Sequence, residues 1–484
     1  MRFLRSLLPF FAGAISVFLL DVEGESSITA SRTYLIMSRA ARSQSPSLIS
    51  YVTTVDHPVI NTPSHHVHHL SRFDLTFEIH GGSQRVKLEL EPNHDILADE
   101  ATIHHIDESG NIYHEEPIER HAHRVFRGRA LVQAPNGKWN PTGWARIYMK
   151  QDGPHPLFDG AFSVANDDHH IELQSIYLDQ KREGDADITP SDEDYMVVYR
   201  ASDMMDYVHT ELKRSWDDEP STCRAHKLHF NSNPQHPVFQ AYANDTSNWQ
   251  GVPTNSLFGL SKRQSDIGGV SGNAGGVNYQ STIGDTSGCP DVKKVALIGV
   301  ATDCEYVQSF KSNDSARDQV ISVINTASNL YEKSLNISIG LRNLRLVSSK
   351  CLGTPPSDMP WNAACDSGMN ITERLNKFSQ WRGNQPDHNA YWTLMSNCAT
   401  KSEVGLSWLG QLCNSEVQTQ GSESVSGTNI VVRTQAKWRV FAHESGHTFG
   451  AVHDCTPQTC SLDRKRGSAG MPRPTHSSRM PSSA

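Results

Sequence analysis

The chain has 484 residues and a formal net charge of −9, with acidic and basic residues mixed along its length. That length predicts two or three domains rather than a single core. The acidic balance argues against nucleic acid as the main partner, because nucleic-acid-binding proteins gather positive charge on one face.

Residues 1–24 have the pattern of a secretory signal peptide. Arg2 and Arg5 precede an apolar run at residues 7–20, and residues 22–24 offer small side chains for cleavage. The run is shorter than the roughly 20 apolar residues that span a bilayer comfortably. No later segment is apolar for long enough to span one. We therefore expect a secreted product without a transmembrane segment.

Cysteine usage agrees with export. Cys223 stands alone, and the other eight of the nine cysteines lie between Cys289 and Cys460. An even cluster in a secreted domain predicts disulfides, but the sequence does not determine their connectivity. Four tripeptides could accept glycans in the secretory pathway, at Asn244, Asn313, Asn336 and Asn370.

Residues 25–263 are predicted to form a β-rich region. Apolar and polar residues alternate along 73–79 and 86–90, on either side of Gly81 and Gly82, which predicts a β-hairpin with one buried face. The region also holds 19 of the 24 histidines, with a cluster at His65, His66, His68 and His69. These histidines indicate a second metal site, a pH-sensing patch or simply a hydrophilic surface.

Lys262 and Arg263 end this region, and a linker follows at residues 264–288, where seven of 25 residues are glycine. Such a segment buries little surface and is accessible. A dibasic-specific processing protease of the secretory pathway is therefore expected to cut after Arg263. Other dibasic pairs occur in the chain, but this one coincides with a domain boundary.

From residue 289 to 460, strands are predicted to alternate with helices. Residues 295–301 form a continuous apolar run, which is typical of a strand covered on both faces. The spacing of apolar residues further predicts a helix over 314–332, a strand over 337–347, a helix over 372–381 and a strand over 390–395. Helices around a mixed sheet place this region in the α/β or α+β class.

Three histidines and a glutamate carry the chemistry of this region. His443 and His447 are four residues apart on a predicted helix, so both can bind one metal ion from the same face. Gly450 can adopt a positive φ and turn the chain, so that His453 supplies a third nitrogen. Three protein ligands leave the fourth tetrahedral position of Zn²⁺ open for water, as in catalytic zinc sites. Glu444 can reach that water without being a ligand.

These residue types predict a zinc-dependent peptidase. Zinc polarises the scissile carbonyl and lowers the pKa of its bound water to about 7. Glu444 is the expected general base, which takes the proton of that water and passes it to the leaving amine. Asp454 directly follows the third ligand and is a candidate for a supporting hydrogen bond. The expected substrates are proteins or peptides.

The segment from Trp438 to Cys455 closely resembles the zinc-binding segment of the adamalysin, or ADAM-type, metalloproteases of the metzincin clan. The order of signal peptide, β-rich propeptide, dibasic junction and catalytic domain is also similar to that family over residues 1–460. The resemblance implies one catalytic Zn²⁺, a mixed five-stranded sheet and an active-site helix. It also implies an edge strand that pairs with an extended peptide, expected at Leu406, Ser407, Trp408 and Leu409.

Cys223 gains a role in this setting. A free thiolate is a good zinc ligand, and the propeptides of the family use a cysteine to occupy the open position on the metal. We therefore expect Cys223 to keep the precursor latent until the propeptide is removed. The alternative is a cysteine that is merely unpaired or bonded to another molecule.

The C-terminal segment departs from the family pattern. Residues 461–484 are rich in Ser, Pro and Gly and poor in apolar side chains, which predicts a disordered, atypical tail. Metzincins carry a methionine turn beneath the zinc, and Met471 lacks the apolar surroundings of such a turn. The lower subdomain is therefore predicted to be incomplete, and the chain to be truncated after the zinc motif. The alternative to a protease is then a weak or inactive protein that only binds zinc or a partner.

Overall fold

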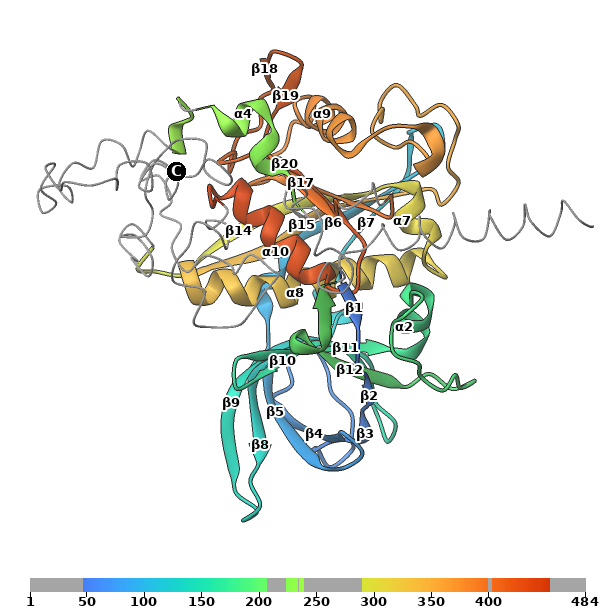
Figure 1. The fold of residues 1–484 in the computed structure, drawn as a ribbon, viewed down its shortest axis with the longest axis vertical. Coiled ribbons are helices and arrows are strands. Elements are labelled where there is room, and N and C mark those ends of the chain that lie inside the picture. Colours follow the sequence, from blue (N-terminus) through green and yellow to red (C-terminus); the bar gives the residue numbers. More distant parts are fainter. Residues whose placement is uncertain (1–46, 207–222, 234, 239–289, 399–402, 453–484) are drawn as a thin grey trace, which may run out of the picture.

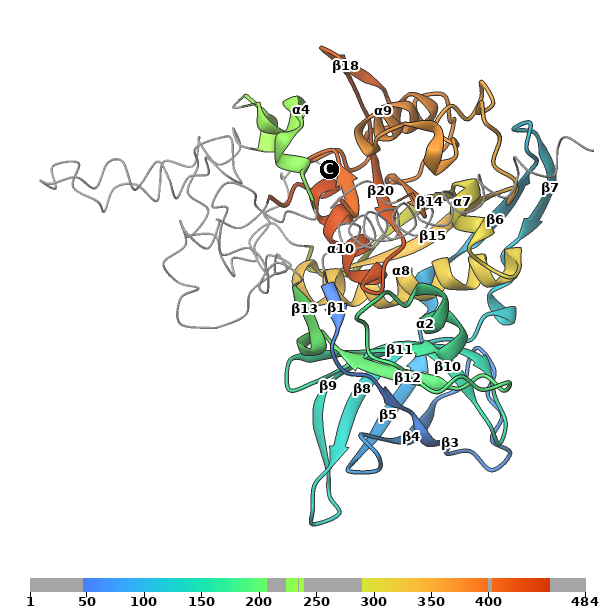
Figure 2. The ribbon, with the colours of Figure 1, turned by 45° about the vertical axis from the view of Figure 1, so that its right-hand side comes forward.

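Figure 1 shows the protein in a computed structural model, as an N-terminal part and a C-terminal part with a long helix between them. A second view shows the same arrangement (Figure 2). The structure describes residues 47–206, 223–233, 235–238, 290–398 and 403–452. The predicted signal peptide (1–24), linker (264–288) and tail (461–484), together with Lys262, Arg263, His453 and Asp454, lie outside the described residues.

The N-terminal part, residues 47–206, is built on a nine-stranded antiparallel sheet in the order β2-β12-β11-β10-β9-β8-β5-β4-β3. The predicted hairpin is confirmed, since β4 (Phe73–Ile79) pairs with β5 (Gln84–Pro92) and burial alternates along both strands. Gly81 and Gly82 both have positive φ in its turn. The other strands of this sheet are β2 (Thr53–Thr54), β3 (Asp56–Ile60), β8 (Val125–Gln133), β9 (Trp139–Gln151), β10 (Leu157–Val164), β11 (Asp167–Leu173) and β12 (Met196–Arg200). Outside the sheet, this part contains α2 (Gln174–Gln180) and the separate pair of β1 (Ser47–Ile49) and β13 (Met204–Asp206).

The C-terminal part, residues 290–452, is built on a seven-stranded mixed sheet in the order β17-β20-β16-β14-β15-β6-β7. Five strands come from this part, and β6 (Leu97–Ile106) and β7 (Ile112–Pro117) come from the N-terminal part. The sheet therefore has seven strands rather than the expected five. The reason is that β6 pairs in parallel with the edge of β15, whose backbone groups would otherwise lack partners. The five strands are β14 (Lys294–Thr302), β15 (Ile337–Val347), β16 (Trp392–Ser396), β17 (Gly405–Ser407) and β20 (Thr428–Val432), beside a separate hairpin of β18 (Gln418–Gln420) and β19 (Glu423–Val425).

The elements predicted after residue 290 are found close to their expected bounds. The apolar run at 295–301 lies in β14, which has parallel neighbours on both sides. The predicted helices are α8 (Asn313–Leu335), whose first turn is capped by the Ser312 hydroxyl, and α9 (Ile371–Arg382). Among the described residues, the further α-helices are α4 (His229–Ser232), which precedes this part, and α7 (Cys304–Gln308) and α10 (Lys437–Thr448) within it. Among the described residues, no helix combines the length and the apolar content needed to cross a bilayer.

Helix α8 is buried on nearly all sides because it lies between the two sheets (Figure 1). It packs on β15 on one side and on β9 and β10 on the other. Its polar side chains have partners in the N-terminal part. Ser322 Oγ donates to Asp159 Oδ1 at 2.5 Å, and Asn325 Oδ1 accepts from Asn93 Nδ2 at 2.8 Å. One of the apolar clusters, which includes Ile103, Tyr148, Ile324 and Leu341, consequently contains residues of both parts.

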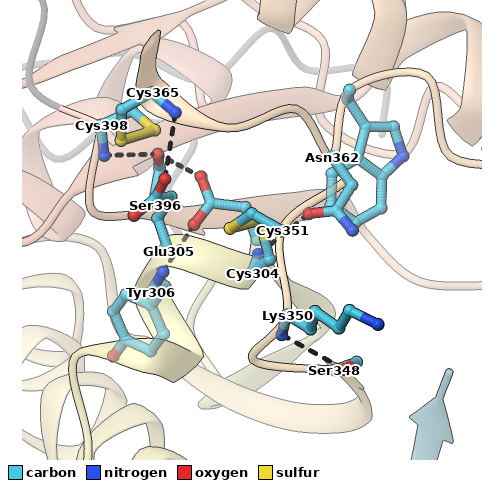
Figure 3. Close-up of a disulfide and its surroundings, with 12 residues drawn as sticks. Cys304, Glu305, Tyr306, Ser348, Lys350, Cys351, Asn362, Cys365, Ser396 and Cys398 are labelled. Carbon is cyan, nitrogen blue, oxygen red and sulfur yellow. Dashed lines mark hydrogen bonds between the residues drawn. A yellow bond between two sulfur atoms is a disulfide. The ribbon is translucent and has the colours of Figure 1, made fainter. Parts of the chain in front are cut away.

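Two disulfides join segments that follow β14, β15 and β16 in the chain (Figure 3). They link Cys304 to Cys351 and Cys365 to Cys398. Cys413 is free and exposed. Four of the eight clustered cysteines thus pair as expected, and three more lie outside the described residues, namely Cys289, Cys455 and Cys460.

Gly299 on β14 provides a test of core packing. A Cβ at this position would overlap the buried ring of Trp392 on β16. We expect Gly299→Ala to lower the free energy of unfolding by about 1–3 kcal/mol, because the added methyl overpacks the core. Urea unfolding of the full chain measures the change. Gly353→Ala is the control, since a Cβ there meets nothing within 4 Å. Equal stability of the two variants would contradict this account of the packing.

Candidate active site

Hydrogen bonds from two tyrosines hold helix α10, which carries two of the three predicted zinc ligands, His443 and His447. Tyr331 Oη of α8 donates to Ala442 O at 2.5 Å. Tyr391 Oη, directly before β16, donates to Ser445 Oγ at 2.8 Å. All four residues are buried. Both bonds reach the same turn of the helix and hold it against α8 and the segment before β16.

His443 and His447 direct their Nε2 atoms at one point, where these atoms lie 3.1 Å apart. His447 Nδ1 donates to Ala451 O at 2.7 Å, which leaves its Nε2 as the nitrogen available to a metal. Gly450 has a φ of +97° and turns the chain so that Ala451 O reaches back to the imidazole. The conformation expected of Gly450 is thus confirmed.

Cys223 lies beside these two histidines, although more than 200 residues separate it from them in the sequence. Its Sγ is 3.5 Å from His447 Nε2 and 3.7 Å from Glu444 Oε2. The ligand atoms of Cys223, His443 and His447 all lie within 4.8 Å of one another. Burial and the neighbouring Glu444 carboxyl raise the pKa of the Cys223 thiol.

The spacing of these donors suits a tetrahedral zinc ion. Zinc bonds of about 2.0 Å to nitrogen and about 2.3 Å to sulfur set neighbouring ligands of a tetrahedral ion about 3.3 Å (N to N) and about 3.5 Å (S to N) apart. The corresponding distances here are 3.1 and 3.5 Å. Glu444 Oε1 is buried and has no hydrogen-bond partner in the described part of the chain. This oxygen can therefore accept a proton or a hydrogen bond next to the nitrogen and sulfur atoms that would bind the metal.

Gly405, the first residue of β17, makes room for the Glu444 carboxyl. A Cβ on Gly405 would overlap that carboxyl, so any other side chain would displace it. Burial raises the pKa of Glu444 to about 8, and the hydrogen bond with Cys223 opposes the rise. Sequence analysis assigned no function to Gly405. The available signal was a glycine at the start of the predicted edge strand.

The predicted substrate strand is the terminal strand of the seven-stranded sheet, but it is shorter than expected. β17 ends at Ser407, and Trp408 and Leu409 follow it. Its one neighbouring strand in the described sheet is β20. On the other side, Ser407 O accepts from Asn231 Nδ2 at 2.9 Å, and Leu409 N–H donates to Asn231 Oδ1 at 2.8 Å. The side-chain amide of Asn231 therefore occupies backbone groups of the edge.

Asn231 belongs to a crossing segment, residues 223–233 and 235–238, that lies along β17. Cys223 forms a parallel bridge with Gly405 at one end. At the other end, the Val238 side chain is buried against Gly410 and Gly450. Between them, the Glu423 carboxylate accepts two backbone N–H groups, from His229 at 2.8 Å and from Phe230 at 2.7 Å. Sequence reasoning singled out only Cys223 in this segment.

The clustered histidines of the N-terminal part do not assemble a second metal site in the structure as described. Within the described ranges, the other group of potential ligands is Glu305, Cys365 and Cys398. The two cysteines of that group are joined in a disulfide.

Residues 291–477 match the family described as Metallo-peptidase family M12, of the reprolysin type. This chain carries a metallopeptidase domain of the adamalysin type. Over 98% of its length, the chain is 56% identical to the "Disintegrin and metalloproteinase domain-containing protein B" of Aspergillus fumigatus. Over 87% of its length, it is 40% identical to the protein of the same name from Arthroderma otae. It spans 58% and 54% of those two proteins.

Two further proteins are less similar to this chain, one over about a third of its length and one in its fold only loosely. The "Zinc metalloprotease mde10" of Schizosaccharomyces pombe is 28% identical over 34% of this chain and 35% of its own. Among solved structures, metalloproteinase-II from Bacteroides fragilis covers 78% of this chain and 80% of its own, with a TM-score of 0.31 and 10% identity.

Gly405 gives a test of the geometry of the adamalysin-type domain. Because a methyl group there would displace the Glu444 carboxyl, we expect Gly405→Ala to lower peptidase activity on the order of 10²-fold. Metal content should stay unchanged, since the atoms nearest to a Cβ on Gly405 all belong to Glu444 and not to the histidines. The measurement is hydrolysis of an unfolded protein per bound zinc. Gly353→Ala serves again as the control. Full activity of Gly405→Ala would show that the position of the Glu444 carboxyl does not depend on the space at Gly405.

Proposed function

We propose that this protein is the precursor of a secreted zinc endopeptidase. The observation that supports this most directly is the group of two imidazole nitrogens and one thiol at zinc-like spacing beside a buried carboxyl. His443, His447 and His453 would hold one Zn²⁺. When bound, this ion supplies polarisation of the scissile carbonyl and a water of lowered pKa.

In this proposal Glu444 is the general base. Its carboxyl is fully buried, next to the histidines, and one of its oxygens is available to accept a proton. It would take that proton from the attacking water and deliver it to the leaving amine. The hydrogen bond from His447 Nδ1 to Ala451 O keeps the imidazole oriented during the reaction. Asp454 would support the third ligand, His453, in a similar way.

Peptide substrates would bind along β17 as an added strand. The backbone groups at Ser407 O and Leu409 N are those that Asn231 occupies in the precursor. Leu406 and Trp408 are buried on the core side, so they support the strand rather than contact a substrate. A peptide that replaces Asn231 gains main-chain hydrogen bonds there, which provide affinity with little dependence on its sequence.

Latency would result from the same crossing segment. Cys223 places sulfur at the metal-binding point, and Asn231 covers the substrate strand. We infer that residues 1–24 direct export and that 25–263 are the propeptide. A dibasic-specific protease would cut after Arg263, at the start of the linker 264–288. This cut would separate the propeptide from the catalytic region at 289–460.

The role of Glu444 is tested by Glu444→Gln, which keeps the shape of the side chain but removes the proton acceptor. We expect activity on an unfolded protein to fall roughly 10²–10⁴-fold in the cut enzyme. Metal analysis should still find about one zinc per chain, whereas His447→Ala should lose it. Glu416→Gln, at an exposed position, is the matched control. Retained activity of Glu444→Gln with zinc bound would refute the role.

The latency proposal predicts that the uncut chain becomes active when the crossing segment is weakened. Cys223→Ala should raise the basal activity of a chain kept uncut by Arg263→Ala, because the sulfur no longer competes with water. Asn231→Ala should raise it about tenfold, since it removes hydrogen bonds worth roughly 1–3 kcal/mol. Cys413→Ala removes an exposed free thiol and should change nothing. If Cys223→Ala behaves like Cys413→Ala, the thiol is not the switch.

A further inference from the structure

Three histidines of residues 47–206 lie in the described contact between the N-terminal and C-terminal parts. All three come from the N-terminal part, on β6, directly before β8 and on β11, and each faces cationic side chains of the C-terminal part. The sets are His104 with Arg345, His123 with Arg317, and His170 with Lys437 and Arg439.

His170 is fixed as a neutral acceptor by the start of α10. Trp438 Nε1–H donates to its Nδ1 at 3.0 Å, and the Tyr199 ring stacks on it at 5.1 Å. Its Nε2 is buried without a hydrogen-bond partner in the described part of the chain. Two cations of α10 and His169 face the ring, and carboxylates pair with both cations: Lys437 with Glu172 at 2.5 Å and Arg439 with Asp168 at 2.9 Å. Burial, followed by these cations, lowers the pKa of His170.

His123 lies against the outer face of α8. Its Nδ1 is 2.8 Å from Tyr148 Oη and 3.8 Å from Asp318 Oδ1. The charged groups that face it are Arg317, Asp318 and Asp314 of α8 and Lys150 of β9, two cations and two anions. Their charges nearly offset one another, so burial dominates and lowers the pKa of His123 to about 4.

His104 lies directly opposite Arg345 in the parallel pairing of β6 with β15. Its Nε2 is 3.4 Å from Glu115 Oε2 of β7, and its Nδ1 is buried without a hydrogen-bond partner among the described residues. Burial and Arg345 lower the pKa of His104, and Glu115 opposes them. Glu115 and His104 belong to the same hairpin and would stay together if the two parts separated, whereas Arg345 would stay with the C-terminal part.

The remaining contacts between the two parts are favourable at neutral pH. β6 adds a full parallel strand to β15, and the polar side chains of α8 find partners in the N-terminal part. Arg146 of β9 pairs with Glu332 of α8 at 3.0 Å with both side chains largely buried. Separating the parts would expose apolar core and leave these polar groups to water.

We propose that this contact is an acid-labile docking surface: the N-terminal part stays on the C-terminal part as a bound subunit after the chain is cut, and leaves when its histidines take up protons. The inference rests on the proposed cut after Arg263 but not on zinc or hydrolysis. Docking holds each histidine neutral, and separation lets it return toward its ordinary pKa of 6.5. The separated state therefore binds more protons in acid, so docking is strongest above about pH 6.5 and weakens as the pH falls toward about 4.

The experiment uses the full chain, cut between residues 263 and 264, in sedimentation velocity over a concentration series at pH 7.5 and at pH 5.0. We expect one complex at pH 7.5 and separated fragments at pH 5.0. If docking lowers the pKa of one histidine from 6.5 to about 4, the dissociation constant rises roughly 25-fold between pH 7.5 and pH 5.0. Fragments that remain together at pH 5.0, or that separate at pH 7.5, overturn the proposal.

Glutamine variants separate this effect from the acid lability of a zinc–cysteine bond. His123→Gln and His170→Gln keep a hydrogen-bonding side chain but cannot take up a proton. In His123→Gln, the ratio of the dissociation constant at pH 5.0 to that at pH 7.5 should be roughly 25-fold smaller than in the unchanged chain. His170→Gln should lower this ratio as well. His155→Gln, at an exposed position of the same part, should leave the pH dependence unchanged. Wild-type pH dependence in both test variants overturns the proposal, even if activity is normal.

Discussion

Helix α8 has almost no face left for water, and the arrangement of the whole molecule follows from that burial. One side of the helix packs on the C-terminal sheet, and the other packs on β9 and β10, which lie far earlier in the chain. Polar side chains such as Ser322 and Asn325 usually lie on the solvent-exposed side of a helix. Here those groups are buried and bonded to the N-terminal part, and one apolar cluster around the helix contains residues of both parts.

The same helix also positions the candidate active site. Tyr331 projects from α8 to the backbone of α10 and links the shared core to the helix that carries His443 and His447. Tyr391 adds a second bond from the central sheet. A metal site needs its ligands held within a fraction of an ångström. In this protein that precision comes from packing around the helix as much as from the helix itself.

Charge is distributed unevenly between the two ends of α10. Its first turn carries Lys437 and Arg439, which meet carboxylates and a neutral histidine of the N-terminal part. Its last turns carry the imidazoles and Glu444, where burial and the nearness of Cys223 govern protonation. One helix thus connects the contact between the two parts with the chemistry of the site. A change at either end acts on the same rigid element.

The sequence by itself determined features that depend on neighbours along the chain. The four-residue spacing of His443 and His447, the turn at Gly450 and the apolar run of β14 are local patterns, set by helical geometry, backbone freedom and strand burial. Tertiary structure alone decided that β6 joins the C-terminal sheet, that Gly405 admits the Glu444 carboxyl and that Asn231 covers the edge strand. These pairings join residues far apart in the chain. No periodicity records them, because they depend on which surfaces meet when the two parts pack.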